Sequence, residues 1–109
     1  MNISNDMIRR MVNAAIAAVP DKVHISAVMG PDRWQPVPQM RYAIWYSLRY
    51  DHGWTYARIG KIFYRDHQVI YYGIKRAEAL LEAEPYGELA NIIQAVRVAN
   101  IAETLRGME

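Results

Sequence analysis

The chain has 109 residues, of which 52% are hydrophobic and 22% are charged, with a formal net charge of +2 and no cysteine. This length and hydrophobic content favour a single domain over residues 1–109 with one core, and they exclude an intrinsically disordered chain. The absence of cysteine excludes disulfides, thiolate zinc sites and thiol catalysis.

The first part of the chain is predicted to contain one regular helix and one short one. Ser4 or Asn5 can cap the first helix, because their side chains accept hydrogen bonds from free N–H groups at a helix start. Apolar residues spaced by three and four positions continue up to Pro20. A proline within a helix loses a hydrogen bond and clashes with the preceding turn, so Pro20 should end this helix. A short helical turn over residues 24–29 follows.

Residues 30–38 contain three prolines and are predicted to form an ordered loop, in which Trp34 and Val37 turn inward. The next helix is predicted over residues 39–50. Its buried side should carry four apolar residues, namely Met40, Ala43, Ile44 and Leu48.

Two good capping residues divide the second half of the chain. Thr55 suits the cap of a helix over residues 56–63, and Asp66 suits the cap of a longer helix that ends near Glu82. A last helix is predicted over residues 88–105. No segment shows the sustained alternation of a strand. We therefore predict an all-α fold of five or six helices.

Residues 55–82 thus form a short helix, a tight turn and a longer basic helix, a layout by which many proteins place side chains in the major groove of DNA. Helical spacing gives the longer helix a core stripe, formed by Ile70, Ile74, Ala77 and Leu81. Gly73 lies beside this stripe and is most easily explained by close packing against the first helix of the pair. The other side is polar and aromatic, with His67, Gln68, Tyr71, Tyr72 and Lys75. Such side chains can bind base edges, phosphates or thymine methyl groups.

Charge is concentrated in the same region. Residues 39–81 contain seven Lys or Arg against three Asp or Glu, whereas residues 82–109 contain five Glu and two Arg. A basic segment within a nearly neutral chain is what a localised phosphate-binding face would show. The candidate phosphate contacts are Arg58, Lys61 and Arg65, together with Thr55 and Tyr56 at the start of a helix whose free N–H groups attract anions.

The order Ile59-Gly60, Phe63 and Arg65-Asp66-His67 resembles the DNA-binding C-terminal domain of the bacterial replication initiator DnaA. The similarity covers roughly residues 7–105, and the specific part is Arg65-Asp66-His67 with its flanks. It implies a Trp-repressor-like helical domain that binds duplex DNA and has no catalytic activity. No phosphate-loop motif is present, so a stand-alone regulator of transcription or replication is implied, of a kind that a phage or mobile element could encode.

The resemblance also implies roles for individual residues. Asp66 and His67 would contact bases in the major groove, and the two positions that follow in the family correspond to Gln68 and Val69. Tyr72 replaces a histidine one turn later, and Lys75 takes the place of a basic contact residue. The family's minor-groove arginine corresponds to Arg41, with its neighbours Gln39 and Met40 as the other candidates. Tyr64 stands where the family has a glycine pair. These departures concern the target sequence more than the scaffold.

Other functional classes are less well supported by the sequence. An enzyme, a cofactor and a metal are not expected, because the three histidines (His24, His52 and His67) are scattered and no nucleophile or phosphate loop accompanies them. No apolar run is long enough to span a bilayer, and the chain start lacks a basic signal-peptide region, so we expect a cytoplasmic protein without a membrane partner.

The alternative is a helical protein-interaction module that keeps the fold without specific DNA binding. The two exposed tyrosines, the low net charge and the acidic last third of the chain favour it. The choice between a monomer and a homodimer stays open.

Overall fold

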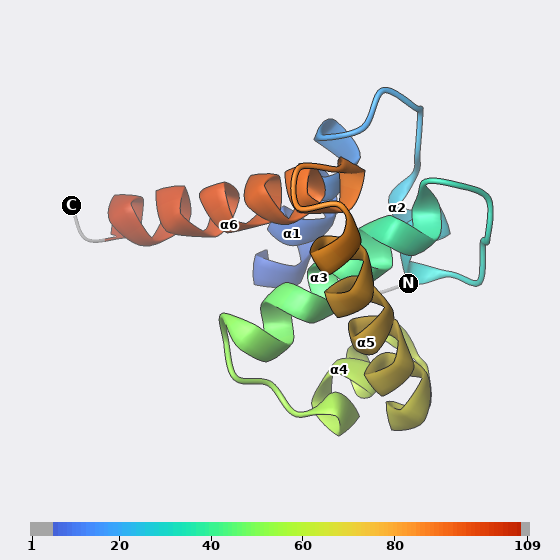
Figure 1. Cartoon of the computed structure of the whole chain (residues 1–109). Helices are drawn as coiled ribbons and strands as arrows, with labels where there is room; N and C mark the ends of the chain where they lie inside the picture. The colour runs from blue at the N-terminus through green and yellow to red at the C-terminus, as the bar shows by residue number, and fades with distance from the viewer. Residues whose placement is uncertain (1–5, 108–109) are drawn as a thin grey trace.

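Apolar residues at helical spacing build six helices between residues 6 and 107, the part of the chain that the computed structural model describes (Figure 1). The helices are α1 (Asp6–Ala17), α2 (Ile25–Met29), α3 (Val37–Tyr50), α4 (Tyr56–Phe63), α5 (His67–Ala83) and α6 (Glu88–Gly107). No strand occurs in this range, so the predicted all-α fold is confirmed. The predicted caps Ser4 and Asn5 lie outside the described residues.

The loop before α3 differs from its prediction in one residue. Val37 is fully buried as expected, but Trp34 is 45% exposed, so its predicted inward position was wrong. Its indole N–H donates to the carboxylate of Asp32 at 3.1 Å, which holds the ring at the surface. The helix α3 also begins two residues earlier than predicted, because Pro38 in its first turn needs no hydrogen-bonded N–H there.

α3 is the central helix, and it packs against α1, α5 and α6 (Figure 1). Its four predicted core residues are fully buried, and Trp45 joins them. The Trp45 ring meets Phe63 of α4 edge-on, with ring centroids 5.8 Å apart. Burying a side chain of this size contributes about 1.5–3 kcal/mol, so this contact anchors α4 to the rest of the core.

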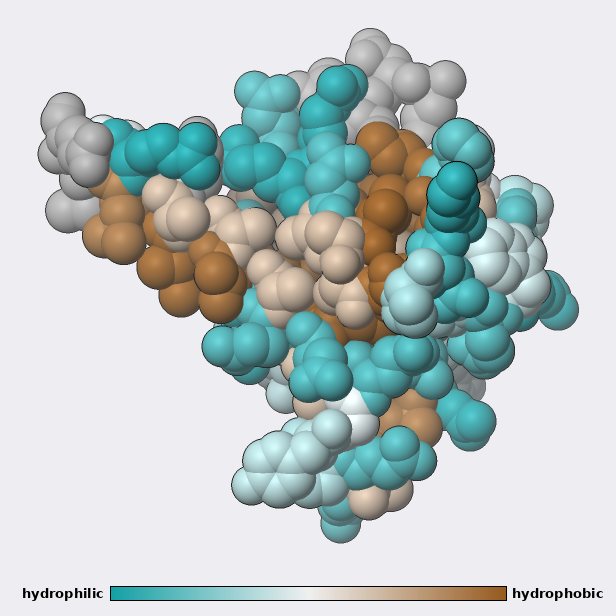
Figure 2. All heavy atoms as spheres, turned by 90° about the horizontal axis from the view of Figure 1, so that it is seen from above, coloured by the Kyte–Doolittle hydropathy of each residue, from teal (hydrophilic) through white to brown (hydrophobic). Residues whose placement is uncertain are grey.

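The second half of α6 extends beyond the other helices (Figure 1). Val98, Ile101 and Leu105 lie along it and are each more than half exposed. Figure 2 shows hydrophobic atoms gathered along this projecting end. We call these three residues the α6 apolar stripe. No helix in the described part of the chain is both long and apolar enough to cross a membrane.

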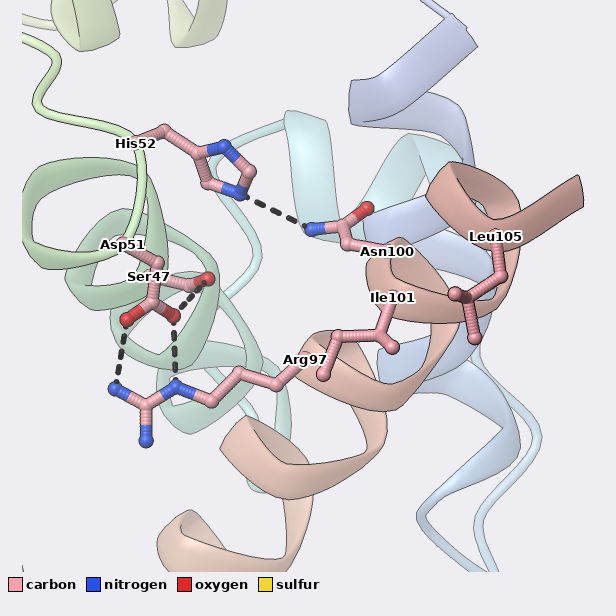
Figure 3. Close-up of a pocket in the computed structure, with 7 residues that line it drawn as sticks. All are labelled: Ser47, Asp51, His52, Arg97, Asn100, Ile101 and Leu105. Atoms are coloured by element: carbon pink, nitrogen blue, oxygen red, sulfur yellow. Dashed lines mark hydrogen bonds and ion pairs between the residues drawn. The ribbon is translucent and has the colours of Figure 1, made fainter. Parts of the chain in front are cut away.

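A pocket of about 370 Å³ lies between the end of α3 and α6 (Figure 3). The Asp51 carboxylate accepts hydrogen bonds from the Arg97 guanidinium at 2.7 and 2.9 Å and from the Ser47 hydroxyl at 2.8 Å. Burial alone would raise the pKa of Asp51, but the bonds from Arg97 and Ser47 hold this pKa below its ordinary value. The charges at this pocket are thus paired within the protein.

Candidate nucleic-acid interface

The pair α4–α5 begins with the cap that the sequence predicts. The Thr55 hydroxyl oxygen accepts a hydrogen bond from the Arg58 N–H at 3.1 Å, which satisfies a free donor of the first turn. α4 then runs from Tyr56 to Phe63, as predicted. Its exposed side carries Arg58 and Lys61, both accessible to a ligand. The Arg58 guanidinium lies 3.8 Å from the ring centroid of Trp54, so this ring orients it.

A three-residue turn, from Tyr64 to Asp66, joins α4 to α5. Tyr64 has φ 57° and ψ 45°, the left-handed conformation that usually favours glycine. Gly60 of α4 packs directly beneath the turn. A Cβ atom at this position would lie well under 3.0 Å from the carbonyl oxygen of Arg65. The absence of a side chain at Gly60 therefore allows the turn to fold back onto α4.

Asp66 caps α5, as predicted, because its carboxylate accepts the Gln68 N–H at 2.8 Å. The Nδ1 atom of His67 lies 3.5 Å from the same carboxylate, and both side chains are about two-thirds exposed. The first turn of α5 therefore offers a carboxylate, an imidazole and an amide together at its surface.

The periodicity of α5 is close to the prediction. Ile70, Ile74 and Ala77 are fully buried, and Leu81 is half-buried. All the predicted contact residues of α5 are exposed, namely His67, Gln68, Val69, Tyr71, Tyr72 and Lys75. α4 and the start of α5 lie together at the lower edge of Figure 1, away from α6.

Three tyrosines link the exposed sides of α4 and α5. The ring centroids of Tyr56 and Tyr71 are 5.4 Å apart, and those of Tyr71 and Tyr72 are 5.5 Å apart. Lys75 lies beside this row, with its ammonium 5.4 Å from the Tyr71 centroid and 3.1 Å from the Glu78 carboxylate. The hydrogen bond with Glu78 raises the pKa of Lys75. These contacts hold a cation and three aromatic edges on one surface.

Gly73 packs against a different helix from the one predicted. A Cβ atom there would lie 2.6 Å from Cζ3 and 2.7 Å from Cε3 of Trp45, both in α3. The prediction that Gly73 faces α4 was therefore wrong. The close contact between α4 and the turn is made instead by Gly60.

The structure also contradicts the minor-groove role predicted for Arg41, which is only 5% exposed. Its Nε donates to the carbonyl of Val28 at 2.8 Å, and one Nη donates to those of Ala27 at 2.8 Å and Gly30 at 2.6 Å. The last carbonyls of a helix have no partner within it, and Arg41 supplies one for α2. Burial, together with the positive charge of Arg65, lowers the pKa of Arg41 to about 10.

The two alternatives to Arg41 differ in accessibility. Met40 is fully buried, whereas Gln39 is half-buried and lines a groove beside α5. Of the three positions, Gln39 is therefore the one that a ligand can reach.

Arg65, which we predicted as a phosphate contact, is half-buried and also has a structural role. It donates to the carbonyl of Phe63 at 2.8 Å and to that of Gly30, which Arg41 also binds. Burial lowers the pKa of Arg65. These bonds attach the turn between α4 and α5 to the end of α2.

The chain matches none of the protein-family models, curated proteins or solved structures with which it was compared. The likeness to the initiator domain therefore stays a prediction. Among the side chains that the structure describes, those of residues 6–102 and 105–107, no group of three or more His, Asp or Glu could hold a metal ion.

Two basic residues that the sequence analysis did not select as contacts join this region. Arg33, in the loop before α3, and Arg76, on α5, are both exposed and line the groove that Gln39 also lines. Arg76 belongs to the basic segment over residues 39–81, so its charge alone could have identified it as a candidate contact. The position of Arg33 beside α5 depends on the path of the loop, which spacing along the chain does not reveal.

The left-handed conformation of Tyr64 leads to a prediction. Replacing Tyr64 with glycine should stabilise the fold by about 0.5–1 kcal/mol, because the relieved strain outweighs the extra freedom of glycine in the unfolded chain. Tyr64 is 75% exposed, so little packing is lost. Urea unfolding followed by circular dichroism measures the change. Tyr64→Ala is the control, since it removes the ring and keeps the Cβ atom. Equal unfolding midpoints for the two variants would contradict a strained Tyr64.

Proposed function

We propose that this protein binds double-stranded DNA sequence-specifically, with the start of α5 in the major groove, and acts as a regulator of transcription or replication. The observation that carries the proposal is the exposed N-terminal half of α5. His67, Gln68, Tyr72 and Lys75 all lie on its accessible surface, and the turn fixed by Gly60 presents it beside α4.

The dimensions of this surface fit the groove. A helix with its side chains is about 10–12 Å across, close to the width of the major groove, so α5 can lie in it. An amide such as that of Gln68 can pair with adenine through two hydrogen bonds, and a lysine can reach guanine. The edges of Tyr71 and Tyr72 can contact thymine methyl groups. This surface therefore has the chemical groups that distinguish base pairs.

α4 supplies the contacts that position a protein on the DNA backbone. Arg58 and Lys61 are exposed on it, and its first turn follows the exposed cap Thr55. Such groups bind phosphates and fix the register without reading sequence. In this arrangement α4 crosses the backbone while α5 enters the groove, as in other helix-turn-helix proteins.

The test is a selection of random 20-base-pair duplexes by the purified protein, followed by affinity measurements on any enriched site. His67→Ala, Gln68→Ala and Lys75→Ala should each weaken binding to that site by roughly 5- to 150-fold, the usual cost of a lost base contact. The chain offers a matched control for each, because His24, Gln94 and Lys22 are exposed on other parts of the molecule. If the two sets of variants bind equally tightly, α5 does not read the bases.

One observation favours the alternative, a helical protein-interaction module. The α6 apolar stripe exposes three large hydrophobic side chains on one projecting helix. Exposed apolar surface of this kind often marks a protein contact. The two functions differ in salt dependence, because neutralising phosphates releases counterions and makes affinity fall steeply with salt. Weak DNA binding that does not change with salt would favour the interaction module.

A further inference from the structure

A groove of about 920 Å³ runs between residues 31–45 and one flank of α5. On the α5 side it is lined at intervals of about one helical turn, by Val69, Tyr72, Gly73, Arg76 and Leu80. It therefore follows the same helix whose first turns we assign to the major groove. We call it the arginine groove, because Arg33, Arg41, Arg65 and Arg76 all line it.

The charged side chains that line this groove are all positive. Four guanidinium groups line it, and no carboxylate occurs among the described side chains of its lining. Arg41 and Arg65 form its inner part and donate to the same carbonyl oxygen, that of Gly30. A carbonyl satisfies their N–H groups but carries no charge to balance them. Asp32 interacts electrostatically with Arg41, and its carboxylate accepts a hydrogen bond from the Trp34 indole N–H.

The two remaining arginines are available to a ligand. Arg33 and Arg76 are exposed on opposite walls, one in the loop before α3 and the other on α5. Gln35 and Gln39 add amide donors on the loop side. Guanidinium groups bind phosphate strongly, because their planar N–H pairs match two of its oxygens. A doubly charged group with several acceptor oxygens suits a groove whose donors come from two walls.

We propose that the arginine groove binds a phosphate group, with Arg33 and Arg76 as direct ligands and with Arg41 and Arg65 as fixed positive charges behind them. The phosphate belongs either to the DNA backbone beside the α5 site or to a free phosphorylated ligand. Only the first source rests on the proposed function. The two sources require the same chemistry at the groove, and they predict different effects on duplex binding.

The first measurement is a titration of the protein with inorganic phosphate, followed by NMR of the arginine Nε–H signals. We expect saturable shifts of the Arg33 and Arg76 signals, and at least tenfold weaker binding in the double variant Arg33→Gln, Arg76→Gln. Arg9→Gln removes one arginine charge from the exposed surface of α1, away from the groove, and should leave phosphate binding unchanged. Circular dichroism verifies that each variant is folded, which we expect because all three side chains are exposed.

The second measurement identifies the source of the phosphate. If DNA supplies it, the double variant should bind every duplex about 3- to 30-fold more weakly, with the same enriched motif. The slope of log affinity against log salt should then fall by about 0.9 per lost contact. If a free ligand supplies it, duplex binding should stay unchanged while phosphate binding is lost.

Two results separate failure of this proposal from failure of the proposed function. Absence of saturable phosphate shifts, together with unchanged duplex binding in the double variant, would overturn the phosphate site and leave DNA binding by α5 intact. Conversely, a protein that binds no duplex but shows the phosphate shifts would support the groove as a site for a free ligand.

Discussion

Gly60→Ala should destabilise the protein by about 1–2 kcal/mol, the steric cost less the helix-forming gain of alanine. The added methyl group would occupy the space of the Arg65 carbonyl, which belongs to the backbone of the turn and cannot rotate away like a side chain. Forcing an extra carbon into a closely packed contact typically costs 1–3 kcal/mol or more. In a helix interior, alanine is more stable than glycine by about 1 kcal/mol. The measured loss of stability is therefore the steric cost minus this gain.

Chemical denaturation measures this loss directly, as the free energy of unfolding of the variant and the wild type. Gly107→Ala is the matched control, because a Cβ atom at Gly107 meets no atom of the described residues within 4 Å. The control should be neutral or slightly stabilising. A Gly60→Ala protein as stable as this control would mean that α4 and the turn are further apart than the structure shows. We also expect folded Gly60→Ala protein to bind DNA more weakly, since the turn orients α5.

Arg41→Ala should also destabilise the protein by about 3 kcal/mol, without a direct effect on DNA contacts. The substitution leaves the carbonyls of Ala27 and Val28 without the donors that now satisfy them, whereas the carbonyl of Gly30 keeps its hydrogen bond from Arg65. A buried acceptor without a partner costs about 1–3 kcal/mol, and the space left by the side chain adds to this. Arg41→Lys should recover only part of the loss, because one ammonium cannot reproduce the guanidinium geometry.

Thermal unfolding and duplex affinity together distinguish this role from the one implied by the initiator resemblance. For the folded Arg41→Ala variant, any loss of duplex affinity should be the same for A·T-rich and G·C-rich flanks, because Arg41 is a buried charge that does not reach the bases. Arg9→Ala provides the reference for loss of an exposed arginine. An unchanged melting temperature combined with weaker binding to A·T-rich flanks would restore the minor-groove role of Arg41.

Local signals predicted the helix pair well. Thr55 and Asp66 are capping residues whose hydrogen bonds reach only two or three positions along the chain, and both caps form. The core stripe of α5 follows from the spacing of Ile70, Ile74 and Ala77, which are all fully buried. Helix caps and buried helix faces depend on residues close together in the chain, so both can be predicted from the sequence alone.

Features that depend on distant contacts were harder to predict. Arg41 binds carbonyls 11 to 14 residues upstream, and nothing in its local sequence marks it as buried. A glycine at position 73, within a helix, indicated close packing at that point. Its packing partner, the Trp45 ring, lies 28 positions away in the sequence. The same limit applies to the candidate site. Its exposed face on α5 follows from helical geometry, whereas the second wall of the arginine groove requires the folded path of the loop before α3.

The shared carbonyl of Gly30 links the α2 region to the orientation of α5, which bears on how binding preference could evolve. One oxygen connects α3, through Arg41, with the turn ahead of α5, through Arg65. If α5 reads bases as we propose, a substitution in the α2 region that shifts this common acceptor would reorient α5 without altering its exposed side chains. Homologous proteins could thus diverge in target preference while their exposed α5 residues stay the same. It also follows that α4 and α5, transplanted into another protein without α2, would lose the support that sets their docking angle.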